Sequence, residues 1–161
     1  MAGRRAVFLD RDGTINEEVG YLDALGKLRL LPGAAGAIGD LNRAGCAVVV
    51  VTNQSGIARG FFDEGFVEET HRRLQDLLRE AGARIDGFYV CPHHPTEGRE
   101  PYRMDCPCRK PRPGMILRAA AEMEISLGES YMVGDTPKDV EAGTRAGARG
   151  ILVRTGYGRE C

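Results

Sequence analysis

The sequence predicts an α/β fold in which helices surround a central parallel β-sheet. Short apolar segments recur along the chain, and amphipathic segments with helical spacing separate them. One apolar segment is an unbroken, largely β-branched run, which is typical of a strand that helices cover on both faces. Because strands that alternate with helices join through right-handed crossovers, neighbouring strands of this sheet should be parallel.

Five apolar segments are the expected strands, in chain order Ala6–Asp10, Cys46–Thr52, Gly87–Cys91, Tyr131–Asp135 and Gly150–Val153. The expected helices lie between them, at 32–44, 63–81, 112–124 and 138–146. Pro32 and Gly45 suit the two ends of the first helix, and Asp63 can cap the second. Two long irregular segments remain, Gly13–Leu31 and Pro92–Pro111, and loops of this length in a small domain are usually functional.

Length and composition restrict the function. A chain of 161 residues predicts one domain over residues 1–161, which should bury about 70% of its unfolded surface without disulfides. The net charge of −1 argues against a nucleic-acid or membrane-surface partner, and we expect a monomer. No apolar run approaches the roughly 20 residues of a membrane span. Because the first apolar run breaks at Asp10 and no secretory cleavage site follows, we expect a cytoplasmic protein.

Two carboxylates follow the first expected strand. Asp10 and Asp12 stand two residues apart, and a strand directs such residues to the same side. Two like charges this close suppress each other's ionisation unless a cation or a shared proton intervenes. The pair therefore indicates a metal site, or a nucleophile or base beside an acid. The alternative is an ordinary strand-to-turn exit, since Asp and Gly are common in turns.

Polar residues also follow two other expected strands. Thr52 and Asn53 stand at the end of the second strand, and Asp135 stands at the end of the fourth. In an open parallel sheet the carboxyl ends of the strands lie at one edge, where ligands bind. Together with Asp10 and Asp12, these residues are therefore expected to converge on one active-site crevice.

The crevice has the groups that phosphoryl transfer requires. Thr52 and the turn that follows it offer neutral donors for phosphate oxygens, and Lys110 is a compact cation beside Arg109. Carboxylates with few other ligands suit Mg²⁺, and one aspartate can attack phosphorus. A second aspartate, kept partly protonated, would give its proton to the leaving alkoxide and then activate water. Asp139 could instead only complement a helix dipole, and Arg112 is expected in solvent.

A cysteine-rich loop spans about residues 91–110. Cys91-x-His93 and Cys106-x-Cys108 enclose twelve residues, and one histidine with three thiolates completes a tetrahedral Zn²⁺ set with no position for water. Such a structural site would fold a loop that cannot bury a core of its own, and it would position the cations that follow. Metal-free cysteines, and His94 in place of His93, are the alternatives.

The remaining cysteines and the helical histidine are expected to take no part in chemistry. Cys46 begins a strand and is expected to be a small core residue, whereas Cys161 is expected to be a free thiol at the terminus. His71 is expected on the surface of a helix.

Several motifs in order resemble the haloacid dehalogenase (HAD) phosphatases over essentially the whole chain. The four superfamily motifs are matched by Asp10-Arg11-Asp12-Gly13-Thr14, Thr52-Asn53, Lys110, and Gly134-Asp135 with Asp139. The closer resemblance is to the D,D-heptose 1,7-bisphosphate phosphatases and the related histidinol-phosphate phosphatases. The segments that carry it are Phe8–Asn16, Gly20-Tyr21, Val51–Arg59, Cys91–Pro95 and Cys106–Pro111.

The resemblance implies a three-layer Rossmann-like fold without a large cap domain. It implies that Asp10 is the nucleophile and Asp12 the acid/base. Mg²⁺ would be held by the Asp10 carboxylate, the Asp12 backbone carbonyl and Asp135. Thr52 and Lys110 would hold the phosphoryl group that is transferred.

The resemblance also implies a substrate-binding set at the mouth of the crevice. Its members would be Glu18, Val19, Gly20, Tyr21, Asn53, Gln54, Ser55, Arg109 and Thr136. Glu18 departs from the shorter acid of the best-known relatives, so the substrate register there is left open. The zinc ligands would be Cys91, His93, Cys106 and Cys108, because the family pattern favours His93.

The activity that the resemblance implies is removal of the C7 phosphate of D-glycero-D-manno-heptose 1,7-bisphosphate, a phosphorylated sugar of lipopolysaccharide synthesis. Tyr21 and Arg109 would discriminate the sugar and its remaining phosphate. Histidinol phosphate, another sugar phosphate and the other anomer are alternative substrates, although Arg109 argues against a cationic amino alcohol. The non-enzyme alternative is a zinc-loop module that binds a protein or nucleic acid, and the complete set of acids with Lys110 argues against it.

Overall fold

The computed structural model describes residues 3–160. The strands are β1 (Ala6–Leu9), β2 (Ala47–Asn53), β3 (Gly87–Cys91), β4 (Tyr131–Gly134) and β5 (Arg149–Leu152). The helices are α1 (Ala34–Arg43), α2 (Gly56–Arg59), α3 (Glu64–Glu80), α4 (Gly114–Met123) and α5 (Pro137–Ala146). Among the described residues there are also three 3₁₀ turns, η1 (Leu25–Lys27) and η2 (Leu127–Glu129) in connections and η3 (Gly156–Glu160) after β5.

The strands form one sheet in the order β3-β2-β1-β4-β5, and every neighbouring pair is parallel. β1 is the central strand, in which Phe8 pairs with Val49 on one side and with Met132 on the other. The chain winds outward from β1 to β3 and then returns to β4, on the other side of β1. A parallel sheet has its ligand crevice at such a reversal, at the carboxyl ends of the strands. The predicted α/β class and parallel sheet are confirmed.

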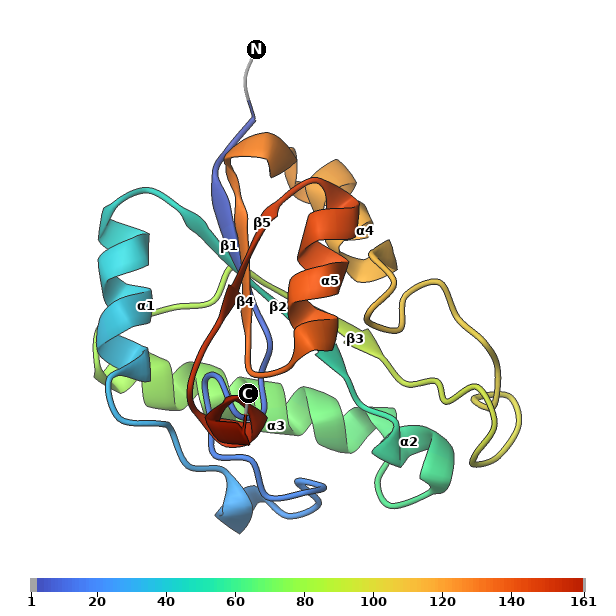
Figure 1. Cartoon of the computed structure of the whole chain (residues 1–161). Helices are drawn as coiled ribbons and strands as arrows, with labels where there is room; N and C mark the ends of the chain where they lie inside the picture. Colours follow the sequence, from blue (N-terminus) through green and yellow to red (C-terminus); the bar gives the residue numbers. More distant parts are fainter. Residues whose placement is uncertain (1–2, 161) are drawn as a thin grey trace.

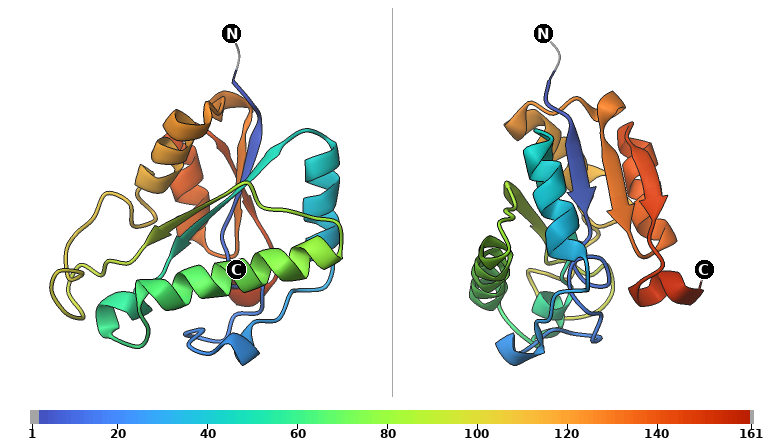
Figure 2. Two further views of the ribbon diagram at one scale, coloured as in Figure 1. Left: turned by 180° about the vertical axis from the view of Figure 1, so that it is seen from behind. Right: turned by 90° about the vertical axis from the view of Figure 1, so that its left-hand side faces the viewer.

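Helices cover both faces of this sheet (Figures 1 and 2). α1 and α3 pack on one face, where Val50 and Leu74 belong to one hydrophobic core. α4 and α5 pack on the other face, where Val49 and Ile116 belong to a second core. Successive valines of β2 therefore enter different cores, which explains why its sequence shows no polar alternation. Within residues 3–160 no cap domain covers the carboxyl edge of the sheet, as the family resemblance implies.

The elements differ from the sequence prediction mainly at their ends. α1 begins at Ala34 rather than at Pro32, because Gly33 has a φ of 84°, which lies outside the helical region. α3 begins as predicted, since the Asp63 side chain accepts a hydrogen bond from the N–H of Phe66 at 2.7 Å. α2 was not predicted, because four residues are too few to show a helical period.

Two cysteine predictions concern residues outside the cysteine-rich loop. The prediction that Cys46 begins a strand and lies in the core is wrong, because β2 begins at Ala47 and Cys46 is only partly buried. The prediction for Cys161 concerns a residue outside the described range. Among the described residues, no helix is long and apolar enough to cross a membrane.

Candidate active site

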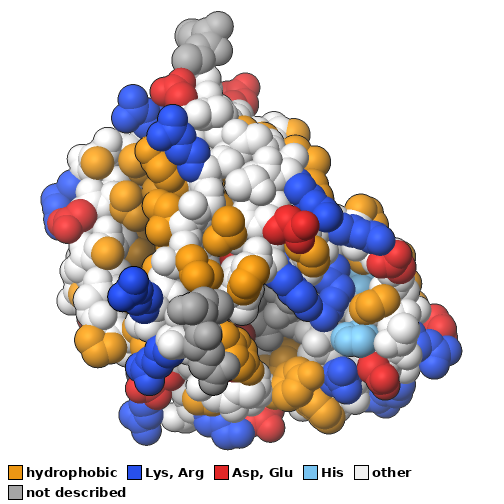
Figure 3. All heavy atoms as spheres, viewed as in Figure 1, with side chains coloured by type: hydrophobic (Ala, Val, Ile, Leu, Met, Phe, Trp, Pro, Cys, Tyr) orange, Lys and Arg blue, Asp and Glu red, His pale blue; other side chains and the backbone are white. Residues whose placement is uncertain are grey.

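A pocket of about 380 Å³ opens at the carboxyl edge of the sheet. The predicted site residues that line it are Asp10, Asp12, Glu18, Gly20, Tyr21, Asn53, Gln54, Ser55, Arg109, Lys110, Asp135 and Thr136. Thr52 is buried beside the pocket, whereas Val19 is 40% exposed and lies outside its lining. Cationic side chains gather between the N-terminal end of α5 and the long loop at 92–111 (Figure 3).

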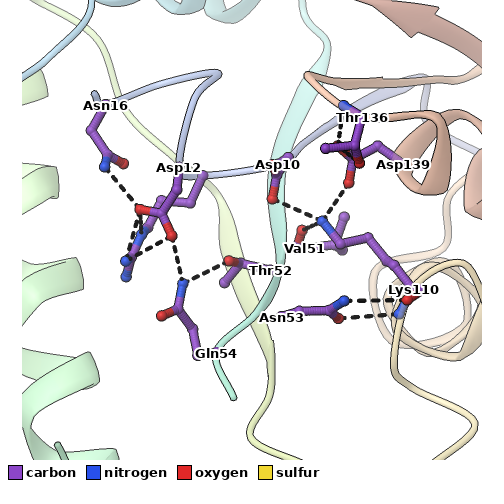
Figure 4. A network of polar contacts seen from close by, with 11 residues as sticks. Asp10, Asp12, Asn16, Val51, Thr52, Asn53, Gln54, Lys110, Thr136 and Asp139 are labelled. Carbon is purple, nitrogen blue, oxygen red and sulfur yellow. Dashed lines mark hydrogen bonds and ion pairs between the residues drawn. The ribbon is translucent and has the colours of Figure 1, made fainter. Parts of the chain in front are cut away.

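Lys110 lies at the centre of one cluster of charges in this pocket (Figure 4). Its Nζ donates to Asp10 Oδ1 at 2.8 Å, to Asp139 Oδ1 at 2.7 Å and to the carbonyl oxygen of Val51 at 2.9 Å. These bonds use all three protons of the ammonium group, and the side chain is only 4% exposed. The structure thus holds one cation between two carboxylates, with its direction fixed by the backbone of β2.

The charged groups of this cluster change each other's pKa. Burial alone would lower the pKa of Lys110, but the charges of Asp10 and Asp139 raise it above its ordinary value. Burial raises the pKa of Asp10 well above its ordinary value, against the charge of Lys110 and with the like charges of Asp139 and Asp12 adding to the effect. Lys110 therefore stays charged, whereas one cation does not compensate all the acids around it.

Asp10, Asp135 and Asp139 form an acidic cluster, in which one carboxylate oxygen from each lies within 4.8 Å of the others. Burial raises the pKa of Asp135 as well. Asp139 uses both oxygens, one on Lys110 and the other on the N–H and hydroxyl groups of Thr136. Hard oxygen donors that carry excess negative charge fit a divalent cation such as Mg²⁺, and Asp10 and Asp135 are the carboxylates best able to take it.

Gly13 allows the loop after β1 to approach Asp135. Its φ is +83°, and a Cβ atom there would lie 2.1 Å from Asp135 Oδ2, so a side chain would be strained and would displace the carboxylate. The backbone N–H of Tyr157, in η3, donates to the same oxygen at 3.0 Å. Two segments that are far apart in the sequence therefore position Asp135.

Asp12 belongs to a separate cluster and points away from Lys110 (Figure 4). Its Oδ1 accepts from Asn16 Nδ2 at 2.9 Å, and its Oδ2 accepts from Gln54 Nε2 at 3.1 Å. Burial alone would raise the pKa of Asp12, but the charge of Arg11 and these hydrogen bonds lower it. These partners therefore stabilise the carboxylate form of Asp12, whereas its expected role as an acid needs a proton that this pocket alone does not favour.

Arg11 is a buried cation behind Asp12, with 1% of its surface exposed. Its Nη1 lies 3.2 Å from Nε2 of His71 in α3, and the imidazole stacks on the Phe88 ring of β3 with centroids 4.4 Å apart. The prediction that His71 lies on a helix surface is wrong, because its side of α3 packs against the β1 loop and leaves it 6% exposed. Burial, followed by the charge of Arg11, lowers the pKa of His71 to about 3, so the imidazole is neutral at pH 7.

Asn53 joins β2 to the segment that contains Lys110. Its Nδ2 donates to the Lys110 carbonyl oxygen at 3.3 Å, and its Oδ1 accepts from the Lys110 N–H at 3.1 Å. The amide that was predicted to bind substrate therefore holds the protein's own backbone, although Asn53 lines the pocket. Thr52 Oγ1 accepts from Gln54 Nε2 at 2.9 Å, which leaves the hydroxyl proton available to a ligand.

The mouth of the pocket is formed by the segment after β1. Glu18 accepts from the N–H of Gly20 at 2.7 Å, and burial, with the charges of Asp12 and Asp135, raises its pKa to about 7. Tyr21 packs edge-to-face on Phe61, with ring centroids 4.8 Å apart. This contact joins the segment that contains Tyr21 to the turn after α2.

The cysteine-rich loop brings its four predicted ligands together. One ligand atom from each of Cys91, His93, Cys106 and Cys108 lies within 4.8 Å of the others. His93 Nδ1 is 3.8 Å from the sulfur atoms of both Cys91 and Cys108. His94 lies outside this group, and its Nδ1 accepts from two backbone N–H groups of its own turn. Three thiolates and one imidazole suit Zn²⁺ with four protein ligands.

Arg109 connects this cysteine cluster to the pocket. Its Nη1 donates to the carbonyl oxygen of His93 at 3.1 Å, while the side chain lines the pocket. Sequence reasoning missed two further lining residues, Lys138 in the first turn of α5 and Tyr157 in η3. The position of Lys138 just after Asp135 could have indicated it, whereas no sequence pattern pointed to Tyr157.

The chain is similar to known phosphatases over nearly all of its length. A family model for HAD-like hydrolases matches residues 107–161. The D-glycero-β-D-manno-heptose-1,7-bisphosphate 7-phosphatase of Photorhabdus laumondii is 46% identical over 156 residues, which are 96% of this chain and 82% of that protein. The protein of the same name from Escherichia coli K12 is 45% identical over 152 residues, covering 94% of this chain and 80% of the relative.

A solved phosphatase structure shares the fold of this chain. The D,D-heptose 1,7-bisphosphate phosphatase of B. bronchiseptica, crystallised with magnesium and phosphate, superposes with a TM-score of 0.88 at 36% identity. The match covers 97% of this chain and 84% of the other. Fold and site together define a phosphatase of the HAD class. Within that class, the chain belongs to the D-glycero-β-D-manno-heptose-1,7-bisphosphate 7-phosphatase family.

Proposed function

We propose that this enzyme removes the C7 phosphate of D-glycero-β-D-manno-heptose 1,7-bisphosphate. The observation that carries the proposal is the convergence of Asp10, Lys110 and Asp135 on one pocket at the carboxyl edge of the sheet. The relatives named above supply the sugar and the anomer. A phosphomonoester hydrolase needs a nucleophile, a fixed cation and a metal site close together, and these residues meet that requirement.

Mg²⁺ is the cofactor that we propose for the acidic cluster. The Asp10 carboxylate, the Asp12 backbone carbonyl and Asp135 would hold it, and the excess of acids over Lys110 supports a divalent cation there. When bound, the ion would supply positive charge to the phosphate oxygens and would offset the repulsion between phosphate and carboxylates. Lys110, whose Nζ donates to Asp10, would stabilise the same charge with its ammonium group.

The two aspartates would divide the chemistry. Asp10 attacks phosphorus, the bond from phosphorus to the C7 oxygen breaks, and Asp12 gives its proton to that leaving oxygen. The negative charge of bound substrate phosphate favours the uptake of this proton, because it raises the pKa of the nearby Asp12. Asp12 then takes a proton from water as the water attacks the aspartyl-phosphate. Phosphate leaves, and Asp10 returns as a carboxylate.

The remaining pocket residues would bind the rest of the substrate. The Thr52 hydroxyl and the turn at Gln54 and Ser55 face the transferred phosphoryl group as neutral donors. Arg109 and Lys138 line the same pocket and would hold the phosphate that stays on the sugar. Glu18, Gly20, Tyr21 and Thr136 line the space between and would contact the sugar.

A structural Zn²⁺ is the second metal that we propose. Cys91, His93, Cys106 and Cys108 would saturate it, so it would take no part in the reaction. Arg109 and Lys110 directly follow the last of these ligands in the sequence. The metal would therefore keep both cations aligned with the pocket, through a loop that has little core of its own.

The first experiment measures phosphate release with Mg²⁺ from a panel of substrates. The panel contains both anomers of heptose 1,7-bisphosphate, fructose 1,6-bisphosphate and histidinol phosphate. We expect the highest kcat/KM for the β-anomer of the heptose. Preference for histidinol phosphate would replace the proposed substrate, and no turnover of any member would return the zinc-loop binding module to consideration.

Lys138 gives a test of how the second phosphate is bound. Lys138→Met should raise KM for heptose 1,7-bisphosphate roughly 10-fold or more, because one charge-assisted hydrogen bond is lost. KM for p-nitrophenyl phosphate, which has no second phosphate, should stay unchanged. Lys27→Met is the matched control, since Lys27 pairs with Asp23 on the surface. Equal changes in KM for the two substrates would contradict the assignment of Lys138.

A further inference from the structure

Arg11 connects the active site to the buried side of α3. Its Nε and Nη2 both donate to Asp12 Oδ1, at 3.0 and 2.9 Å, and Nη2 also reaches Oδ2 at 3.2 Å. Its Nη1 points the other way, to Nε2 of His71 at 3.2 Å. A guanidinium group carries only donors, so in this pair Nε2 of His71 must accept. The imidazole is therefore neutral and carries its proton on Nδ1.

The surroundings of His71 keep it in this form and in this place. Its ring stacks on Phe88 with an interplanar angle of 15°, and only 6% of its surface is exposed. A protonated imidazole would offer Arg11 a second cation instead of an acceptor, and burial with the charge of Arg11 lowers the pKa of His71 to about 3. His71 thus satisfies a donor of a buried arginine that would otherwise be left without a partner.

This arrangement fixes the plane of the Asp12 carboxylate. Two nitrogens of a planar guanidinium hold the carboxylate on one side, while Asn16 and Gln54 donate to it from other directions. The guanidinium is in turn held by His71, which belongs to the 17-residue helix α3. A carboxylate that must deliver a proton to one oxygen atom gains most from such orientation.

We propose that Arg11 and His71 are positioning residues for proton transfer by Asp12, with Arg11 orienting the carboxylate and His71 orienting Arg11. The inference rests on the proposed function, in which Asp12 protonates the leaving oxygen. Neither residue touches the reacting atoms. Their effect should therefore depend on how strongly the leaving group needs a proton.

The test compares leaving groups. A sugar alkoxide or a phenolate leaves with difficulty and needs the proton, whereas p-nitrophenolate leaves readily without it. The first irreversible step, transfer of the phosphoryl group to Asp10, determines kcat/KM, so this parameter reports the protonation of the leaving group. The substrates are heptose 1,7-bisphosphate, phenyl phosphate and p-nitrophenyl phosphate, each with saturating Mg²⁺.

His71→Leu removes the acceptor while it keeps an apolar side chain beside Phe88. We expect kcat/KM to fall about 10- to 100-fold for heptose bisphosphate and phenyl phosphate, within the total contribution of general acid catalysis. For p-nitrophenyl phosphate the fall should be less than about 3-fold. His71→Gln, whose side-chain oxygen can accept in place of Nε2, should restore most of the lost activity.

Two further variants separate positioning from stability. Thr70→Val is the matched control, because Thr70 is the buried neighbour of His71 and bonds only within α3, to the carbonyl oxygen of Phe66. It should leave all three values of kcat/KM unchanged. If His71→Leu does not fold, Arg11→Lys takes its place, since it keeps the charge but loses the planar two-nitrogen grip. It should produce the same dependence on the leaving group.

Equal losses for all three substrates, or no rescue by His71→Gln, would overturn the inference and leave His71 a structural residue. The proposed substrate is tested separately by the wild-type enzyme. If wild type ignores heptose bisphosphate but hydrolyses both aryl phosphates, the proposed function fails, and the ratio between the aryl substrates still decides the role of His71.

Discussion

Asp10 and Asp12 stand two residues apart at the end of β1, yet their surroundings are opposite in kind. Asp10 lies beside Lys110 among two further acids, and its pKa is raised well above its ordinary value by burial. Asp12 lies in the grip of Arg11, where that charge and hydrogen bonds from two amides outweigh burial and lower its pKa. Around Asp10 the positive charge of Lys110 does not balance the acids, whereas around Asp12 the charge of Arg11 balances the carboxylate.

The difference teaches how two identical side chains are suited to the two roles proposed for them. Residues from other segments decide their chemistry, since Lys110 comes from the cysteine-rich loop whereas Arg11 is held by α3. The Asp10 region is suited to receive a cation, which would ionise the nucleophile. The Asp12 region is suited to receive a phosphate, whose charge would return a proton to the acid. The two pKa shifts by themselves favour the reverse assignment, so the cation and the phosphate that the two regions bind decide the proposed roles.

Asp10→Asn breaks the first half of the comparison and should have the largest effect. Loss of a covalent nucleophile should lower kcat on the order of 10⁵-fold and abolish the aspartyl-phosphate. The measurement is phosphate release, together with trapping of labelled phosphoenzyme by acid quench. Asp76→Asn, an exposed acid on α3, serves as the control. Retained turnover in Asp10→Asn would eliminate the covalent mechanism.

Asp12→Asn breaks the second half and should have a smaller, selective effect. We expect kcat to fall roughly 10²- to 10⁴-fold, the contribution of general acid–base catalysis. With p-nitrophenyl phosphate, which needs no acid, the first step should survive and the hydrolysis of the intermediate should stall. A burst of p-nitrophenol equal to the enzyme concentration, measured by rapid mixing, checks this. Absence of both the burst and the phosphoenzyme would contradict this expectation, because it would show that the first step needs Asp12 even with this leaving group.

Removal of a ligand of the proposed zinc site should disturb the Asp10 region and spare the Asp12 region. Cys106→Ser should lose the metal and loosen the loop that carries Lys110, which lowers kcat/KM on the order of 10²-fold through misplacement of the cation. Metal analysis and hydrogen exchange at the Lys110 N–H measure the two effects. Cys46→Ser, outside the cluster, should change neither. Full activity in a zinc-free Cys106→Ser protein would separate the loop from catalysis.

The smallest expected effect concerns the pH dependence of stability, and it tests the environment of His71, which lies behind Asp12. The pKa of His71 is about 3 in the folded protein and 6.5 in the unfolded chain. Between these values the unfolded chain binds a proton that the folded protein does not, so stability falls as pH drops below 6.5. The loss is about 1.4 kcal/mol per pH unit, or about 2 kcal/mol from pH 6.5 to 5. Urea unfolding of wild type and His71→Gln should show this difference, and parallel pH dependence would contradict it.

Much of the fold and of the pocket could be predicted from the sequence, because both follow from local patterns. The apolar run of β2 predicted a buried strand, and the polar residues after β1, β2 and β4 predicted where the pocket lies. The contacts of His71 could not be predicted. A histidine among the charged residues of α3 resembles a surface residue until Arg11 and Phe88, from other segments, are brought against it.

The same limit applies to charge. The sequence places carboxylates at a strand end, but their ionisation depends on which cation lies nearest in space, and Arg11 is adjacent to both of them in the chain. Only the folded arrangement shows that its guanidinium grips Asp12 and that Lys110, a hundred residues away, pairs with Asp10. Asn53 is a similar case, since an amide beside a pocket suggests a ligand contact until its backbone partner is seen.

The reciprocal bonds between Asn53 and Lys110 do for one residue what a neighbouring strand does for many. One side-chain amide satisfies both backbone groups of Lys110, at the point where β2 ends beside Cys91 of β3. These two hydrogen bonds hold the segment that contains Lys110 against the end of β2. The side-chain amide that makes them has its own signals in a nitrogen-15 spectrum. Those two side-chain signals offer a built-in reporter, which would register any movement of the loop without the alteration of a single charged residue.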